Sequence, residues 1–174
     1  ALDKRKLCIQ RRSSLSKTER LLKEKAITNC VLPFLKGKIG IYISIRNEVD
    51  VYSFIKDQFD LYIPKMLDDV MIAFYSDHEE KIQGKFSTIE PIGIHEEKDL
   101  DVILVPVVGF FKNYRMGYGK GYYDRFLQIH SLISVGLCYN SLIVKNVPTD
   151  TYDKKVDLIV SENGVVNVNG GKNG

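Results

Sequence analysis

The sequence predicts an α/β fold, a single three-layer α/β/α domain with a mostly parallel sheet. Apolar runs rich in Val, Ile and Leu alternate with segments of helical periodicity, which is the order that builds β–α–β units. Most of these runs are apolar at nearly every position, as expected for strands that helices cover on both faces. The length of 174 residues is enough for one such domain with its own core.

Two helices are expected at the amino-terminal end, a short basic one over residues 3–12 and a longer one over residues 16–32. Ser16 and Glu19 have the spacing of a capping box, in which each side chain bonds a backbone N–H that the first turn leaves unpaired. Pro33 ends the second helix because it cannot continue the backbone hydrogen bonds. The apolar residues at near-helical spacing are Leu15, Leu22, Ala26 and Ile27.

The rest of the chain alternates between strands and helices. Helices are expected over residues 49–57 and 122–130. Strands are expected over residues 38–45, 59–64, 69–75, 102–107, 132–139 and 156–161. The domain is expected to span residues 1–168, and the Gly- and Asn-rich residues 169–174 are expected to form a disordered tail.

The charge of the chain is uneven. Residues 1–32 hold nine Lys and Arg against three Asp and Glu, a net charge of +6, whereas the other 142 residues hold 16 against 19. A basic end on an acidic body indicates an anionic ligand near that end, and the alternative is a solvated helix face.

Several classes of protein are not indicated. No apolar run reaches the ~18 residues of a membrane-spanning helix. The cysteines Cys8, Cys30 and Cys138 are odd in number and form no CxxC pair, which indicates neither a disulfide framework nor a zinc site. We therefore expect a cytoplasmic protein that binds no membrane, and we also expect a monomer.

The stretch RMGYGKGYYDRFL, residues 115–127, predicts a phosphate site. Its three glycines lack a Cβ, so the backbone can approach phosphate oxygens closely. Arg115 and Lys120 supply positive charge, and the helix that follows begins with free N–H groups. The stretch also follows the most apolar strand, and ligands in open α/β sheets bind beyond the carboxyl ends of the strands.

Two better-known phosphate loops do not match this stretch. A P-loop requires Ser or Thr after its lysine, but Gly121 follows Lys120. The dinucleotide fingerprint is GxGxxG, whereas this stretch reads GxGxG. A flexible turn is therefore the alternative for the glycines taken alone.

The whole string RMGYGKGYYDRFL resembles the signature of the 5-formyltetrahydrofolate cyclo-ligase family, also called methenyltetrahydrofolate synthetases. Other segments resemble that family in the same order along the chain. They are the basic opening with Arg5, Arg11 and Leu15–Ser16, IGIYISIRNEV (39–49), IPK (63–65), IEPIG (89–93), DVILVPVVGF (101–110) and VPTDTYDKKVDLIVSENGV (147–165). The chain departs from the family pattern at Ala1, where Lys is usual, at Leu142, where Gln is frequent, and at Tyr152, where His is frequent.

The resemblance implies a role for each matched residue. ATP would be enclosed by Arg5, Arg115, Gly117, Tyr118, Gly119, Lys120, Gly121, Tyr122 and Tyr123. Among these, Arg115, Lys120 and Tyr122 would take part in catalysis. The folate would be bound by Ile43, Glu48 and Tyr122, and Mg²⁺ would be held by Asp124 and Asp153.

Each role has a simpler alternative. Glu48 could be a surface turn residue, and Asp153 an ordinary loop acid. Asp124 could stabilise the start of its helix, since acids favour the first turn. Arg5 could be a solvated charge.

The reaction implied by the resemblance is the ATP-dependent conversion of 5-formyltetrahydrofolate to 5,10-methenyltetrahydrofolate, with release of ADP and phosphate. No nucleophile of the Ser-His-Asp or Cys-His kind is required, and we expect His78, His95 and His130 to be solvent-facing or structural. One competing hypothesis is a nucleic-acid-binding module that uses the basic amino terminus and the YGKGYY aromatics. Another is an ATP-independent sugar-phosphate enzyme of related fold. The acidic body of the chain favours an enzyme that binds no nucleic acid.

Overall fold

The computed structural model describes residues 2–68, 71–84, 88–107, 109–111, 114–116, 121–142 and 156–166, with backbone alone for residues 2–5, 109–111 and 114–116. Its centre is a seven-stranded sheet in the order β11-β10-β9-β6-β1-β2-β3. The strands are β1 (Lys38–Gly40), β2 (Asp60–Met66), β3 (Ile72–Ser76), β6 (Val102–Pro106), β9 (Ile133–Leu137), β10 (Leu158–Ser161) and β11 (Gly164–Val166). All neighbours from β10 to β2 are parallel, whereas the two outermost strands, β3 and β11, are antiparallel to their neighbours.

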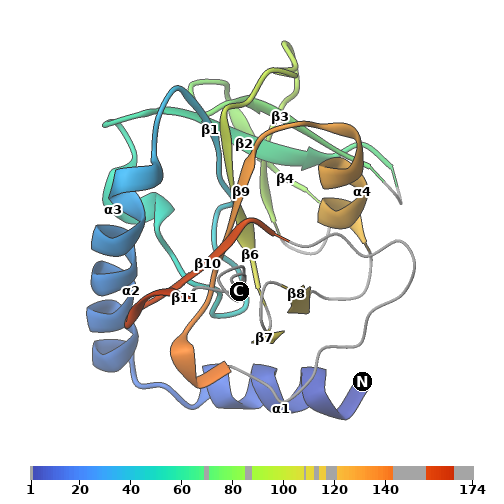
Figure 1. Cartoon of the computed structure of the whole chain (residues 1–174). Helices are drawn as coiled ribbons and strands as arrows, with labels where there is room; N and C mark the ends of the chain where they lie inside the picture. The colour runs from blue at the N-terminus through green and yellow to red at the C-terminus, as the bar shows by residue number, and fades with distance from the viewer. Residues whose placement is uncertain are drawn as a thin grey trace.

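Helices cover the sheet on both sides, which confirms the predicted α/β fold. The helices are α1 (Leu2–Ser13), α2 (Lys17–Val31), α3 (Tyr52–Ile55) and α4 (Tyr122–Ile129), with short 3-10 turns η1 (Leu32–Phe34) and η3 (Asn140–Leu142). Figure 1 shows α2 and α3 on one side of the sheet and α4 on the other, with α1 running across one end of the strands. None of the helices in the described part of the chain is long and apolar enough to span a membrane.

The predicted capping box at the start of α2 is confirmed. The Ser16 hydroxyl accepts the Glu19 N–H, and the Glu19 carboxylate accepts the Ser16 N–H, both at 3.1 Å. The predicted apolar stripe of this helix is partly wrong, because Leu22 is 65% exposed. The face that packs on β10 and β11 instead consists of Glu24, Ile27, Thr28 and Val31, which follow the i, i+3, i+4, i+7 spacing of one helix side.

Some predicted elements are shorter than the sequence indicates. The strand expected over residues 38–45 pairs only over Lys38–Gly40, because the chain then turns tightly, with Arg46 and Asn47 at φ values of 51° and 62°. The helix expected over residues 49–57 is the single turn α3. Two short hairpins were not predicted, β4 (Lys81–Gln83) with β5 (Ile89–Pro91), and β7 (Gly109–Phe111) with β8 (Tyr114–Met116).

The core is built around β6, whose five residues are all buried. Its neighbour β1 contains Gly40, where a Cβ would lie 2.9 Å from Leu100 Cδ1 and 3.2 Å from Phe74 Cε2. The Leu100 distance is shorter than real Cβ atoms show and the Phe74 distance is tighter than most, so a side chain at this position would force its neighbours to shift.

We therefore predict that Gly40→Ala lowers the free energy of unfolding by about 1–3 kcal/mol, the usual cost of overpacking a core. Urea denaturation would measure it. Lys25→Ala, on the exposed face of α2, is the control, with an expected change within about 0.5 kcal/mol. Equal losses in the two variants would mean that the core around Gly40 accommodates a methyl group.

Candidate active site

The carboxyl ends of the parallel strands meet at the edge of the sheet that lies next to α1. Figure 1 shows α1, β7 and β8 gathered at this edge. The helix α1 contacts this edge through η3, which follows β9. The Arg11 guanidinium donates a hydrogen bond to the Ser141 carbonyl at 3.4 Å, and the Cys8 thiol donates one to the Leu142 carbonyl at 3.9 Å. The basic amino-terminal helix is thus docked where ligands bind in open α/β sheets.

A loop of residues 41–51, which follows β1, holds the two residues expected to bind folate. Ile43 is partly buried against the core, and Glu48 is only 5% exposed. The Glu48 carboxylate accepts the Ile45 N–H at 2.9 Å, and the Glu48 N–H donates to the Ile45 carbonyl, also at 2.9 Å. The alternative of a surface turn residue is therefore wrong in one respect, because Glu48 lies at a tight turn but its side chain is buried.

Side chains outside the turn hold this loop in place. The Arg20 guanidinium donates to the Asn47 side chain, and the Tyr42 hydroxyl donates to the Val49 carbonyl at 2.7 Å. The Glu24 Oε2 atom accepts both the Asp50 N–H, at 2.9 Å, and the Tyr139 hydroxyl, at 3.1 Å. The loop is therefore tied to α2, and through Glu24 to the end of β9.

The start of α4 carries the end of the glycine motif. Gly121 precedes the helix with φ = 73°, a left-handed conformation that costs other L-residues about 1–2 kcal/mol. Tyr122 is buried, Tyr123 and Asp124 are half-buried, and the Arg125 guanidinium lies 5.6 Å from the centre of the Tyr122 ring. Asp124 is in the first turn, where an acid is favourable next to the positive end of the helix. This position suits both a metal ligand and a helix-stabilising acid.

Tyr42 links the loop to the start of α4. Burial is the main cause that raises the pKa of its hydroxyl, and the nearby Glu48, Tyr123 and Tyr139 raise that pKa further. Glu48 in the loop, a predicted folate residue, and Tyr123 at the start of α4, a predicted ATP residue, are therefore both close enough to the Tyr42 hydroxyl to act on its pKa.

Other predicted site residues can be placed only in part. Arg5 lies in α1, and Arg115 lies in β8, where it pairs with Phe110. Gly117, Tyr118, Gly119, Lys120 and Asp153 lie outside the described residues. Within the described part of the chain, no group of three or more His, Cys, Asp or Glu side chains is arranged to hold a metal ion.

The described cysteines and histidines offer no nucleophile at this edge. Burial raises the pKa of both the Cys8 and the Cys138 thiols, which keeps them protonated and unreactive. His78 and His95 are exposed, and the His130 ring stacks on Phe126 at 4.0 Å between centroids. The histidines are thus solvent-facing or structural, as predicted.

Sequence reasoning missed three buried polar residues of this region. Arg12 is 1% exposed, Glu24 is 7% exposed, and Tyr139 is fully buried. Glu24 had a usable signal, because it lies three and four residues before Ile27 and Thr28 on one helix face. The sequence signal for the burial of Arg12 was weaker, and consisted of its position four residues after Cys8.

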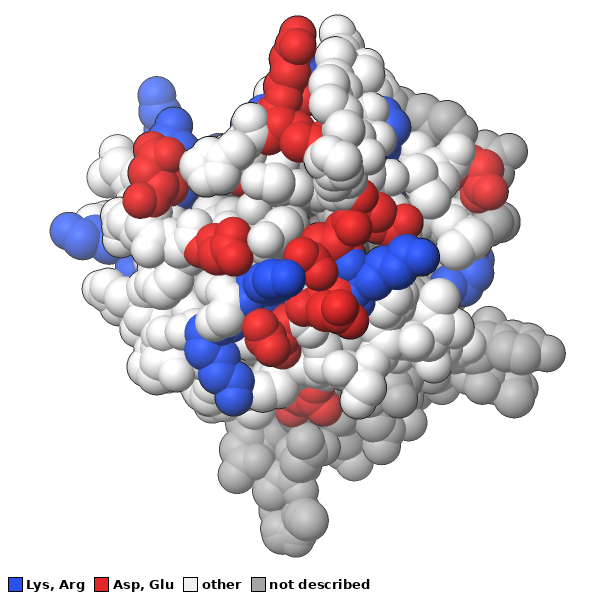
Figure 2. Space-filling view, turned by 90° about the horizontal axis from the view of Figure 1, so that it is seen from above, with Lys and Arg blue, Asp and Glu red and all other residues white. Residues whose placement is uncertain are grey.

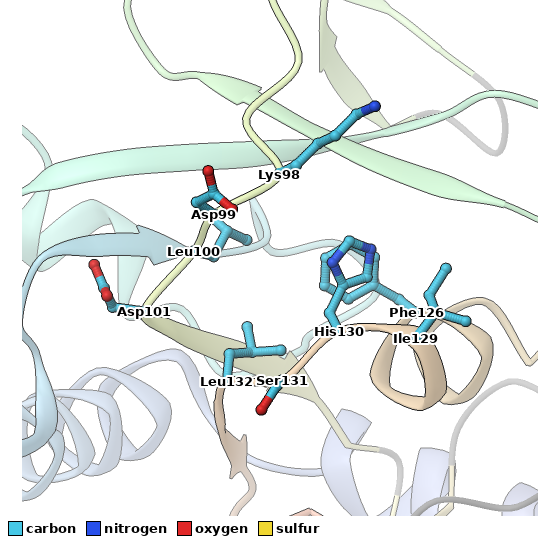
Figure 3. Close-up of a pocket in the computed structure, with 9 residues that line it drawn as sticks. All are labelled: Lys98, Asp99, Leu100, Asp101, Phe126, Ile129, His130, Ser131 and Leu132. Atoms are coloured by element: carbon cyan, nitrogen blue, oxygen red, sulfur yellow. The ribbon is translucent and has the colours of Figure 1, made fainter.

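A cavity of about 350 Å³ lies at the opposite edge of the sheet, at the amino ends of β6 and β9. Its lining comes from residues 98–101 and from five residues between Phe126 and Leu132 (Figure 3). Figure 2 shows this end of the molecule, where acidic and basic side chains lie next to one another. One such pair is the Lys38 ammonium and the Glu97 carboxylate, which are 2.8 Å apart. The cavity contains none of the predicted site residues, so it is separate from the candidate active site.

Comparison with known proteins identifies the family. Residues 3–162 match the 5-formyltetrahydrofolate cyclo-ligase family. The chain belongs to this family. A 5-formyltetrahydrofolate cyclo-ligase of Mycoplasma pneumoniae is 33% identical over 171 residues, which cover 91% of this chain and 96% of that protein. The predicted family and enzyme class are thereby confirmed.

Two solved structures of 5,10-methenyltetrahydrofolate synthetases share the fold. The protein from Aquifex aeolicus has a TM-score of 0.79 and 34% identity, with 94% of this chain and 90% of that chain covered. The protein from M. pneumoniae has a TM-score of 0.75 and 28% identity, with 92% and 97% covered. The cyclo-ligase fold therefore extends over almost the whole chain.

The buried Glu24 carboxylate gives a pH-dependent prediction. Burial raises its pKa, opposed by the hydrogen bonds from Asp50 and Tyr139 and by Arg20, while the Asp50 charge adds to the rise. A carboxyl whose pKa is raised on folding stabilises the fold fully below its unfolded pKa, and that contribution is lost as the pH rises through the folded pKa. Glu24→Gln should therefore gain stability relative to the wild type as the pH rises above about 4.5, as measured by urea denaturation at a series of pH values.

Glu19→Gln on the same helix is the matched control, because the hydrogen bonds to Ser16 lower the pKa of Glu19. Its contribution is present above the unfolded pKa and is lost only as the pH falls below it, so the stability of this variant relative to the wild type should stay nearly constant as the pH rises above about 4.5. The same trend in both variants would contradict the environment assigned to Glu24.

Proposed function

We propose that this protein uses ATP to close 5-formyltetrahydrofolate into 5,10-methenyltetrahydrofolate, releasing ADP and phosphate. The main support is the family match over residues 3–162, in a chain that covers 96% of a curated cyclo-ligase. The arrangement of the described residues agrees with it, since α1, the loop of residues 41–51 and the start of α4 share one edge of the sheet.

The chemistry requires activation of a poor electrophile, the formamide carbonyl on N5 of the folate. Transfer of the γ-phosphoryl group of ATP to the formyl oxygen turns that oxygen into a leaving group. N10 then attacks the formyl carbon and loses its proton, and phosphate departs as the five-membered ring closes. Such a reaction depends on positioning and on neutralising phosphate charge rather than on a protein nucleophile.

The residues that would neutralise the negative charge of the phosphates come from separate segments of the chain. Arg115 and Lys120 would contact the transferred phosphoryl group, and the free N–H groups at the start of α4 would face the ATP phosphates. Arg5 would approach from α1. Gly121 supplies the left-handed step that leads the chain from the glycine motif into α4.

The folate would lie against the loop of residues 41–51. The buried Glu48 carboxylate suits the N–H donors of a pterin, because charge-assisted hydrogen bonds are strong when shielded from water. Ile43 would line the pocket, and Tyr122 would contact the ring system. Tyr122 is buried at the start of a helix, which argues against the nucleic-acid-binding alternative, where aromatic residues stack bases on an exposed surface.

Asp124 and Asp153 would hold Mg²⁺. The half-buried Asp124 carboxylate fits a Mg²⁺ ion held by one or two carboxylates plus phosphate oxygens, which needs no cluster of protein ligands. When bound, the ion neutralises negative charge on the phosphates. The cytoplasmic location, the monomeric state and the domain limit at residue 168 remain predictions.

The reaction can be followed by near-ultraviolet absorbance, because the methenyl product absorbs where the formyl substrate does not. We predict an increase that requires 5-formyltetrahydrofolate, ATP and Mg²⁺ together. Lys120→Ala should lower kcat at least about tenfold, the scale of one lost charge-assisted contact in the transition state. Lys25→Ala should retain full activity. No absorbance change, from folded protein that binds ATP, would overturn the proposed reaction.

Glu48→Gln separates folate binding from loop structure. The amide oxygen can still accept the Ile45 N–H, so the turn is preserved while the buried charge is removed. We expect folate affinity to fall about tenfold or more, the scale of a lost charge-assisted hydrogen bond, with ATP affinity almost unchanged. Calorimetric titration with each ligand would measure both. An equal loss for the two ligands would contradict the role of Glu48.

A further inference from the structure

We propose that Glu24 and Arg20 of α2 are positioning residues that set the shape of the folate-binding loop, and hence the orientation of Glu48. This inference rests on the proposed function for its effect on catalysis. Neither residue belongs to the matched motifs that imply contacts with ATP or folate. They would act on the folate through the loop of residues 41–51, which both of them contact.

Glu24 is a junction between three parts of the fold. One of its carboxylate oxygens, Oε2, accepts both the Asp50 N–H and the Tyr139 hydroxyl, at 2.9 and 3.1 Å. It is 7% exposed, so these bonds are shielded from water and their loss would leave a buried N–H and a buried hydroxyl unsatisfied. A single atom therefore joins α2, the loop and the end of β9.

The turn within the loop needs such restraint. Arg46 and Asn47 both adopt positive φ values, 51° and 62°, which are uncommon for residues other than glycine and are better tolerated by asparagine than by arginine. Conformations of this kind persist only where the surroundings fix them. The surroundings here are the Arg20 bond to the Asn47 side chain on one side of Glu48 and the Glu24 bond to the Asp50 N–H on the other.

The direction of the Glu48 carboxylate depends on the same turn. It accepts the Ile45 N–H, and the Glu48 carbonyl accepts the Ser44 hydroxyl at 2.8 Å. Loss of the outer restraints would let the turn relax and would move Glu48 with it. The proposed ATP residues that the structure describes lie on α1, on β8 and at the start of α4, outside this loop, so this relaxation should affect the folate far more than ATP.

Substitutions at Glu24 distinguish hydrogen bonding from charge. Glu24→Gln can place its carbonyl oxygen where Oε2 lies and keep both bonds, whereas Glu24→Ala removes both. We expect Glu24→Ala to raise the KM for 5-formyltetrahydrofolate about 5- to 30-fold, the loss of one to two hydrogen bonds. Its KM for ATP and its kcat should change less than about twofold, and Glu24→Gln should restore the folate KM to within about threefold of the wild type.

Two further variants keep the test decisive if Glu24→Ala does not fold. Asn47→Gly removes the acceptor of Arg20 while favouring the same left-handed backbone, and it should raise the folate KM in the same selective way. Tyr139→Phe removes one donor to Glu24 and leaves the Asp50 bond in place, so its effect on the folate KM should be the smaller one. Equal changes in the KM for folate and for ATP, or no change in Asn47→Gly, would overturn the proposal.

A readout independent of activity separates this proposal from the proposed function. Amide hydrogen exchange at Glu48 and Asp50, whose N–H groups bond Ile45 and Glu24, should accelerate in Glu24→Ala and Asn47→Gly and stay close to wild type in Glu24→Gln. If the wild type fails to cyclise folate, the proposed function is wrong. The amide exchange rates then still test whether α2 holds the loop. Unchanged exchange in both Glu24→Ala and Asn47→Gly would overturn that role.

Discussion

The central strand β6 must be covered on both faces, and this requirement decides where the protein can place polar groups. All five residues of β6 are buried, and the adjacent β1 allows Leu100 and Phe74 to approach its Gly40 closely. With helices on both faces, only the two edges where strands begin and end remain open to ligands. At the carboxyl edge, the chain places buried polar side chains on the surrounding elements. Arg12 is on α1, Glu24 on α2, and Glu48 in the loop after β1.

Much of the fold follows from local signals in the sequence. The capping box of Ser16 and Glu19, the apolar run of β6 and the glycine step at Gly121 each specify their structure without distant partners. The remainder depends on tertiary pairing. Residues 42–45 have the composition of a strand, but the chain leaves the sheet after Ile41, whose N–H still bonds the Tyr62 carbonyl. The turn that follows is fixed from α2 through Asn47 and Asp50. The antiparallel direction of β3 and β11 is likewise set by the chain path around the sheet, which periodicity does not encode.

The candidate site likewise contains residues that the sequence predicts and residues that only the structure identifies. Glu48, Tyr122 and Asp124 could be predicted because they lie in motifs that the family resemblance identifies. Sequence reasoning missed Glu24 and Tyr139, because their contact joins residues 115 positions apart. A buried acid on an otherwise apolar helix face is the signal that sequence reasoning could have used, since such a group requires a partner. The identity of that partner depends on the packing of α2 against the sheet, which is known only from the structure.

The uneven charge of the chain acquires a physical meaning from the position of α1. Its arginines lie at the carboxyl edge, next to the end of β9, and Arg11 bonds the carbonyl of Ser141 there. Electrostatic influence in physiological salt falls off over about 8–10 Å, so these charges act on that edge rather than on the whole surface. At the opposite edge, the Lys38 ammonium pairs with the Glu97 carboxylate, and the Asp101 carboxylate accepts the Lys38 backbone N–H. Two anionic substrates, ATP and a folate, would therefore be attracted to the carboxyl edge by α1, and the loop held by Glu24 and Arg20 would then decide how the folate is oriented.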